Sequence, residues 1–292
     1  MYTVLNVTIG AGTAQDSSHP PQLVPEQEYE PSPAAHCTSG KRYVVLSLGI
    51  SVLDYSVVLD EFPAVGTKQV ATKQTTAGGG NAANTAVCLS RLGLPVQLMS
   101  KVADDPAGQT LLRELQEEGV CCTGTVQVAR RSSMREQDDG TLSDSGRSTV
   151  TCFVLVAGDT RTIVSMPYSQ RVLDLEPEWV ERQLLVTNDG RDLLSQVGLL
   201  QLDGRHPAAA ARAAQLARSR GVPVLVEAEL RSPGMMSKQG AELLELLSLS
   251  DYVVMSEEFP AAVTGLTDLN DALATIVNRC VRHHYHATQS LK

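Results

Sequence analysis

Short apolar runs alternate along the chain with segments whose apolar residues recur at helical spacing. Tyr43–Gly49 is a continuous apolar run that ends in glycine, which is typical of a buried strand in a parallel sheet. We expect four further strands of this kind, at Pro95–Val102, Val197–Leu202, Val222–Glu227 and Asp251–Met255. Helical spacing between them predicts a helix that ends at Gly93 and helices at Pro106–Glu118, Glu176–Val186, Pro207–Arg220 and Gly240–Leu247, with helical stretches from Glu257 and Asp268.

This alternation of strands and helices predicts an α/β fold with a doubly wound, mostly parallel sheet. Two segments depart from the pattern. Residues 68–75 alternate and are rich in Thr and Val, which indicates a half-exposed strand, and the apolar stretches within 149–166 flank Gly158-Asp159, which predicts a β-hairpin. We expect these antiparallel strands to form a small separate sheet.

The chain divides into a leader, one large domain and a tail. Residues 1–42 are rich in Pro, Ser, Gly and Gln, and we expect them to be mostly disordered. The domain spans 43–280 and contains a polar insertion at 130–148 that lacks any periodicity, and residues 281–292 form a tail.

Composition excludes several classes of partner. The net charge is −9 and the basic residues are scattered, so a nucleic-acid partner is not expected. No apolar run approaches the roughly 20 residues of a membrane span. The six cysteines contain no C-x-x-C pair, which favours reduced thiols and a cytoplasmic location, although the leader leaves organelle import open. His283, His284 and His286 lack companion ligands, so we expect no metal site there.

The strongest local signal is the sequence Gly78-Gly-Gly-Asn-Ala-Ala-Asn84 between a strand and a helix. Gly79 and Gly80 let backbone amides approach a ligand, and the helix N-terminus attracts oxygen atoms. Asn81 and Asn84 add donors and acceptors on one side of the first helical turn, which suits recognition of several hydroxyl groups. A tight turn with Asn as a helix cap explains the same residues equally well.

Polar residues follow several of the predicted strands at their carboxyl ends, where open α/β sheets bind ligands. Asp54 lies just beyond the first strand, and Asp203 and Arg205 follow Val197–Leu202. Glu227, Glu229 and Arg231 follow the next strand at a spacing of two, which would put them on one side. Together they predict a polar cleft, although capping residues and solvated strand ends would give a similar pattern.

Several motifs together resemble the PfkB carbohydrate kinases, a ribokinase-like family. They are Gly78–Asn84, Leu-Ser-Arg-Leu-Gly93, Lys101-Val-Ala-Asp-Asp-Pro-Ala-Gly108, Leu-Gln-Glu-Glu-Gly-Val120 and Asp251-Tyr-Val-Val-Met-Ser-Glu-Glu258. The resemblance covers roughly residues 43 to 278 and is greatest to ketohexokinase-like and plant-type PfkB proteins.

The resemblance implies phosphorylation of a sugar or sugar-like hydroxyl with ATP and Mg²⁺, under a small β lid through which a homodimer can form. By position in the family's motifs, the implied substrate-binding residues are Asp54, Gly79, Gly80, Asn81, Asn84, Asp203 and Arg205. Those on the phosphate and magnesium side are Glu227, Glu229, Arg231 and Glu258. Ser256 and Phe259 depart from the family's Asn-x-x-Glu motif, which Glu258 would compensate.

Family members continue with a further strand and a Gly-Ala-Gly-Asp motif that supplies the anion hole and the catalytic base. The 292 residues contain no Gly-Ala-Gly-Asp sequence, so this chain offers no catalytic residue. We therefore expect a C-terminally truncated kinase with an incomplete, uncovered sheet edge that by itself is inactive and holds ATP and Mg²⁺ poorly. A non-catalytic sugar-binding or regulatory module and a nucleoside kinase are the alternatives.

Overall fold

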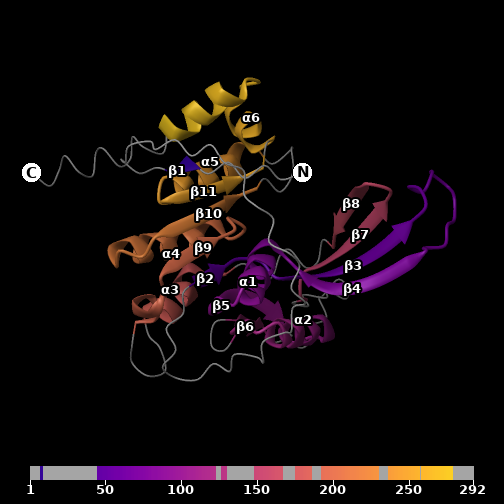
Figure 1. Cartoon of the computed structure of the whole chain (residues 1–292), viewed down its shortest axis with the longest axis horizontal. Coiled ribbons are helices and arrows are strands. Elements are labelled where there is room, and N and C mark those ends of the chain that lie inside the picture. The colour runs from indigo at the N-terminus through magenta and orange to yellow at the C-terminus, as the bar shows by residue number, and fades with distance from the viewer. Residues whose placement is uncertain are drawn as a thin grey trace, which may run out of the picture.

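The computed structural model describes residues 7–8, 45–122, 126–129, 148–166, 175–185, 192–229, 236–256 and 258–278. Two sheets organise the fold (Figure 1). One has seven strands in the order β1-β11-β10-β9-β2-β5-β6, and the other has four strands in the order β4-β3-β7-β8. The doubly wound α/β architecture expected from the sequence is confirmed.

The seven-stranded sheet is parallel except at one edge. Its parallel strands are β2 (Val45–Leu48), β5 (Val96–Ala103), β6 (Val126–Ala129), β9 (Leu199–Leu202), β10 (Val224–Ala228) and β11 (Tyr252–Met255). From β2 the chain builds outward through β5 and β6, and later returns to the other side of β2 with β9, β10 and β11. The order therefore reverses between β2 and β9, which is where open α/β sheets form a ligand crevice at the strands' carboxyl ends.

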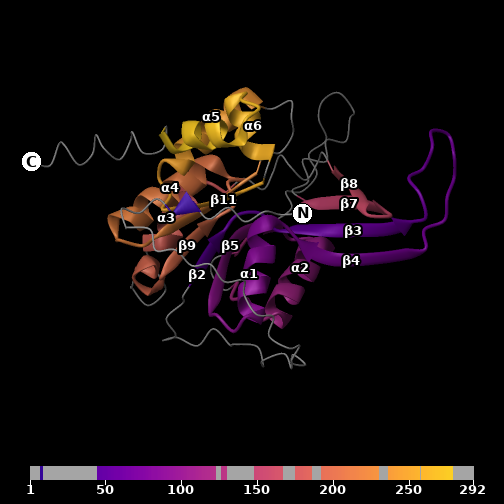
Figure 2. The ribbon, with the colours of Figure 1, turned by 45° about the horizontal axis from the view of Figure 1, so that its top comes forward.

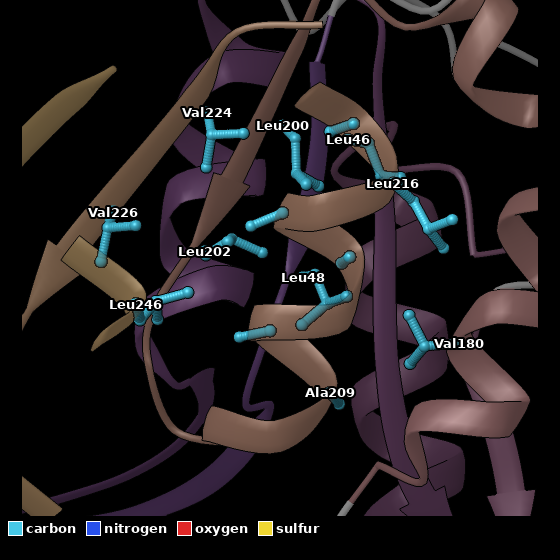
Figure 3. Close-up of a cluster of buried hydrophobic side chains, with 14 of the residues drawn as sticks. Leu46, Leu48, Val180, Leu200, Leu202, Ala209, Leu216, Val224, Val226 and Leu246 are labelled. Carbon is cyan, nitrogen blue, oxygen red and sulfur yellow. The ribbon is translucent and has the colours of Figure 1, made fainter. Parts of the chain in front are cut away.

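Alternate residues of these strands pack into two hydrophobic cores, one on each face of the sheet. Val45, Val96 and Leu98 pack against α1 (Asn81–Arg91) and α2 (Pro106–Glu117). Leu46, Leu48, Leu200 and Leu202 instead meet α3 (Pro177–Leu185), α4 (Pro207–Ser219) and α5 (Met236–Leu247), as Figure 3 shows beneath α4. A short 3₁₀ turn, η1 (Leu193–Gln196), precedes β9, and α6 (Glu258–Thr264) is followed by a helix over residues 269–278. The two-faced burial explains why the strands are apolar runs without alternation.

The four-stranded sheet extends away from the large sheet as a lid (Figure 2). It consists of β3 (Val52–Leu59), β4 (Lys73–Gly79), β7 (Thr151–Ala157) and β8 (Thr160–Ser165), and every residue of β8 is exposed. Pairing places Asp54 beside Cys152 and Cys152 beside Ser165, so these three residues share a face. The predicted hairpin around Gly158-Asp159 is confirmed by β7 and β8.

Two details of the lid differ from the sequence expectation. Asp54 lies within β3 rather than in a loop after the first strand, because the apolar run Val52–Leu59 forms a lid strand of its own. The strand expected at 68–75 begins at Lys73 and continues through Gly79, because Gly78 and Gly79 pair with Leu53 and Val52. Only Gly80 therefore forms the turn into α1.

Two residues of the leader, Val7 and Thr8, belong to the described part of the chain. They form β1 (Val7–Thr8), which pairs antiparallel with β11 and so covers the edge that we expected to be open. Cys88, Cys122 and Cys152 are free thiols, but Cys121 is disulfide-bonded, contrary to the expectation of reduced thiols throughout. Among the described helices none is long and apolar enough to cross a bilayer, and the cytoplasmic location stays a prediction. The polar insertion, apart from Ser148, and the tail lie outside the described residues.

Candidate functional site

The point where the sheet order reverses is held by the carboxylate of Asp203, at the end of β9. Its Oδ2 accepts hydrogen bonds from the backbone amides of Ile50 (2.7 Å) and Ala82 (3.3 Å), and its Oδ1 accepts one from the amide of Arg205 (2.9 Å). The side chain is buried, with 1% of Asp203 exposed. Asp203 thus connects the strand end to the chain before β3 and to the first turn of α1.

The turn into α1 requires glycine at one position. Gly80 has φ 96°, in the region that favours glycine, and a Cβ there would lie 2.4 Å from the carbonyl oxygen of Ile50. This close approach brings the start of α1 against the chain that leads into β3. No side chain caps the helix, so Asn81 is not the helix cap that the alternative interpretation assumed.

Asn81 instead contacts two carboxylates, one within β10 and one on the residue that follows it. Its Nδ2 donates to Glu229 Oε2 (2.8 Å) and, more weakly, to Glu227 Oε1 (3.3 Å). Arg205 donates through Nη2 to the same Glu229 oxygen at 2.6 Å, which makes a charge-assisted pair. The structure therefore brings Asn81, Arg205, Glu227 and Glu229 together, from three separate parts of the chain.

This cluster crowds negative charge around Glu227. Burial is the main cause that raises the pKa of the Glu227 carboxyl above its usual range, and the carboxylates of Asp203 and Glu229 raise it further. Arg205 lowers it and only partly compensates. The carboxylate oxygens of Glu227 and Glu229 could accept hydrogen bonds from the donors of a ligand, or bind a cation.

Asp54 faces the same region from the lid. A Cβ on Gly79 would lie 2.4 Å from Asp54 Oδ2, so glycine there is what leaves room for the carboxylate. Burial raises the pKa of Asp54, and Arg161 on β8 opposes that shift. No described residue donates a hydrogen bond to this half-buried carboxylate, which leaves its oxygens able to accept from a ligand.

Cys152 links Asp54 to the Arg205 cluster. Burial is the main reason that the pKa of its thiol is raised; the hydrogen-bonded Ser165 hydroxyl lowers it, Asp54 raises it and Arg205 lowers it. The thiol therefore lies within electrostatic reach of both sides of the site. Sequence reasoning missed Cys152, Arg161 and Ser165, because only the strand register of the lid reveals that they share a face with Asp54.

Asn84 is placed apart from this cluster. Its side chain is exposed and lines a cavity of about 380 Å³ between β4, α1 and α2. Gly78 and Gly79 also line the cavity, and Glu114 on α2 accepts a hydrogen bond from the Gly78 amide at 2.6 Å. The cavity lining includes neither Asp54 nor Asn81, so the predicted substrate residues fall into two neighbouring places.

The two other predicted residues are Glu258 and Arg231. Glu258 is the exposed first residue of α6, and Arg231 lies outside the described residues. In the part of the chain that the structure describes, no three His, Cys, Asp or Glu side chains are grouped to hold a metal ion.

Comparison with known proteins gives one family match. The pfkB family carbohydrate kinase profile matches residues 44–135. Over 89 residues the chain is 35% identical to a nucleoside kinase of Methanothermobacter thermautotrophicus, a match that covers 30% of this chain and 29% of that protein. Over 236 residues it is 27% identical to mouse ketohexokinase, covering 77% of this chain and 69% of that enzyme. The chain thus spans less than a third of the nucleoside kinase in that match.

Solved structures agree on the fold. A putative ribokinase from Agrobacterium tumefaciens has a TM-score of 0.62 at 21% identity, covering 82% of this chain and 67% of that one. Arabidopsis thaliana ribokinase, complexed with ribose and ATP, has a TM-score of 0.57 at 18% identity, covering 82% and 69%. A putative ribokinase II from E. coli, in complex with ATP and Mg²⁺, has a TM-score of 0.60 at 15% identity, covering 81% and 70%. The chain therefore matches the PfkB carbohydrate kinases over residues 44–135, and its described part has the ribokinase-like fold.

Proposed function

We propose that this chain carries the substrate-binding part of a kinase that phosphorylates a hydroxyl group of a sugar or sugar-like polyol. The observation that carries the proposal is the hydrogen-bonded meeting of Asn81, Glu229 and Arg205. Asp54 lies on the lid beside Cys152, whose thiol feels the charges of both Asp54 and Arg205. A sugar presents many hydroxyl groups in a small volume, and each can donate to a carboxylate or amide oxygen. The described site offers such acceptors from the lid, from α1 and from β10.

The proposed roles follow from which side-chain atoms already make hydrogen bonds within the protein. Asp54 accepts no hydrogen bond from a described residue, so its two oxygens would accept from sugar hydroxyls. Asn81 uses its Nδ2 on the two glutamates, so its Oδ1 would be the atom that accepts a hydrogen bond from a sugar hydroxyl. Gly79 and Gly80 would admit the sugar close to the backbone, and Arg205 would supply donors. Asn84 would join only from the side of the α1–α2 cavity.

ATP and Mg²⁺ are proposed as partners because solved neighbours of this fold contain them. Glu227 is a candidate to bind a cation, since it lies near Asp203 and Glu229 and, among the described residues, accepts one weak bond of 3.3 Å, from Asn81. Magnesium in such enzymes usually takes one or two carboxylates together with phosphate oxygens, a role for which Glu227, Glu258 and Arg231 are the candidates. The bound ion would neutralise phosphate charge during transfer.

The absence of a Gly-Ala-Gly-Asp sequence in the 292 residues predicts weak or no phosphoryl transfer by this chain alone. Loss of a base and of an anion hole each costs roughly 10² to 10⁴ in rate. The same fact supports the second candidate, a sugar-binding or regulatory module without catalysis. A nucleoside kinase is the third, supported by the partial match to the archaeal enzyme.

A homodimer through the lid is part of the proposal. Phe153 and Val164 lie opposite each other on β7 and β8, with 43% and 47% exposed, and the ring of Tyr55 lies 5.6 Å from that of Phe153. These side chains form an exposed apolar group on one face of the lid. Light scattering after gel filtration tests the dimer, and Phe153→Ser is expected to halve the mass of the wild-type particle; a wild-type monomer would contradict it.

Titration calorimetry with a panel of neutral pentoses, hexoses and nucleosides tests the proposed site. We expect one class to bind, and Asn81→Ala to weaken it about 10- to 100-fold, equivalent to about 1–3 kcal/mol for hydrogen bonds of this kind. Asn270→Ala, at an exposed position in the helix over 269–278, is the matched control and should leave affinity unchanged.

Parallel measurement of ADP formation separates the candidates. Sugar binding without turnover supports the binding module, turnover supports the kinase, and preference for nucleosides supports the third candidate. If the wild-type chain binds no polyol, or if Asn81→Ala and Asn270→Ala behave alike, the assigned pocket is wrong.

A further inference from the structure

The buried carboxylate of Asp203 differs from the other acids of the site in what it binds. Sequence reasoning assigned Asp203 to the substrate. Its three hydrogen-bond donors among the described residues are all backbone amides, those of Ile50, Ala82 and Arg205. With 1% of the residue exposed, a ligand in the cleft has no route to its oxygens.

Each of the three amides belongs to a segment that carries a proposed ligand-binding side chain. Ile50 leads directly into β3, which bears Asp54. Ala82 follows Asn81 in the first turn of α1, and Arg205 is bonded through its own amide. One carboxylate therefore joins the lid, the helix start and the end of β9.

The space for this carboxylate depends on a neighbouring glycine. A Cβ on Gly49 would lie 2.1 Å from Asp203 Cγ and Oδ2, so glycine at that position is what lets the carboxylate reach the amide of Ile50. Hydrogen bonds from amides to a charged oxygen are stronger than neutral ones, and a displacement of about 1 Å at a binding site can cost about 10²-fold. Loss of the Asp203 charge would loosen three ligand-binding side chains at once.

We propose that Asp203 is a positioning residue, which fixes Asp54, Asn81 and Arg205 relative to one another and does not itself contact the sugar. The inference rests on the proposed function for its ligand. It predicts that loss of Asp203 weakens every hydroxyl contact together, whereas a direct ligand would lose the contact to one hydroxyl only.

The test uses the full chain with the sugar that binds in the panel above and a set of its monodeoxy analogues. Asp203→Asn is expected to lower the affinity for the parent sugar and for each analogue by a similar factor, about tenfold or more. Gly49→Ala should have the same effect without removing the carboxylate. Asp251→Asn is the matched control, because Asp251 Oδ2 also accepts from a backbone amide, that of Val224 at 2.8 Å, but at the opposite ends of the strands.

Hydrogen exchange followed by mass spectrometry supplies a readout that does not depend on the sugar. In Asp203→Asn the amides of Ile50 and Ala82 should exchange faster, while Asp251→Asn should leave them unchanged. If neither site variant folds, the wild-type chain is measured instead: these two amides should already exchange slowly without sugar.

Three results would overturn the inference. One is a monodeoxy analogue whose affinity Asp203→Asn leaves unchanged, because Asp203 would then bind the missing hydroxyl directly. Another is unchanged exchange at Ile50 and Ala82 in a variant that has lost sugar affinity, and the third is protection of these amides only when sugar is added. Failure of the wild-type chain to bind any polyol would instead overturn the proposed function, and the inference with it.

Discussion

Gly80 and Gly79 are adjacent, but the structure predicts opposite consequences for replacing each with alanine. In Gly80→Ala the new Cβ lies 2.4 Å from Ile50 O and 3.0 Å from Ser51 Cα, and backbone atoms cannot rotate away. The residue would also keep φ 96°. In Gly79→Ala the nearest atom is Asp54 Oδ2, at the end of a side chain that can move.

The two costs can be worked from these contacts. For Gly80→Ala, a strained backbone costs about 1–3 kcal/mol and overpacking about 1–3 kcal/mol, while the stiffer unfolded chain returns about 0.4–1 kcal/mol. We expect the free energy of unfolding to fall by about 3 kcal/mol. Gly79→Ala should lower it by less than about 1 kcal/mol but displace Asp54 and abolish sugar binding.

Urea unfolding followed by circular dichroism measures both variants. Gly221→Ala is the control, since Gly221 has φ 68° and nothing within 4 Å of its Cβ position, so that it isolates the backbone cost of about 1–2 kcal/mol. If Gly80→Ala is no more destabilised than Gly221→Ala, or if Gly79→Ala binds sugar normally, our reading of the close approach at the start of α1 is refuted.

Three further predictions concern pH, reactivity and packing. Burial raises the pKa of Asp54 above its unfolded value of 3.8. The contribution of this carboxyl to stability is therefore fully present below pH 3.8 and is lost as the pH rises through the raised folded pKa. Asp54→Asn should resist urea better than wild type at neutral pH but not at or below pH 3.8. Burial raises the pKa of the Cys122 thiol to about 12. Alkylation of the native protein with iodoacetamide, followed by mass spectrometry, should therefore label the exposed Cys88 and spare Cys122. Equal labelling of the two thiols would contradict the buried placement of Cys122. Leu202 is fully buried between the sheet and α4, and Leu202→Ala should lower the free energy of unfolding by about 2–5 kcal/mol, against a negligible change for exposed Leu92→Ala.

The parallel sheet was predictable from sequence because its strands are buried on both faces. Runs such as Val45–Leu48 and Val224–Ala228 are mainly apolar, with one polar residue each, and they showed no alternation of exposed and buried positions. This pattern indicated strands buried on both faces. The glycine-rich start of α1 was predictable for a similar reason, since Gly80 is needed for a backbone conformation that other residues rarely adopt.

The arrangement of the site was only partly predictable. Strand β3 follows β2 after only three residues and is also largely apolar, so nothing in its pattern separated Asp54 from the first strand. The contacts of Asp203 with three amides, and the register that sets Cys152 beside Asp54, depend on residues that are far apart in the chain. Composition and spacing along one segment carry no information about such pairings.

A crystal structure of the chain soaked with the sugar that it binds tests the central claim most directly. The account predicts electron density for the sugar with hydroxyl groups within hydrogen-bond distance of Asp54 Oδ1 or Oδ2 and of Asn81 Oδ1, beneath the lid. Density confined to the cavity between α1 and α2 beside Asn84, or a sugar that contacts neither Asp54 nor Asn81, would contradict it.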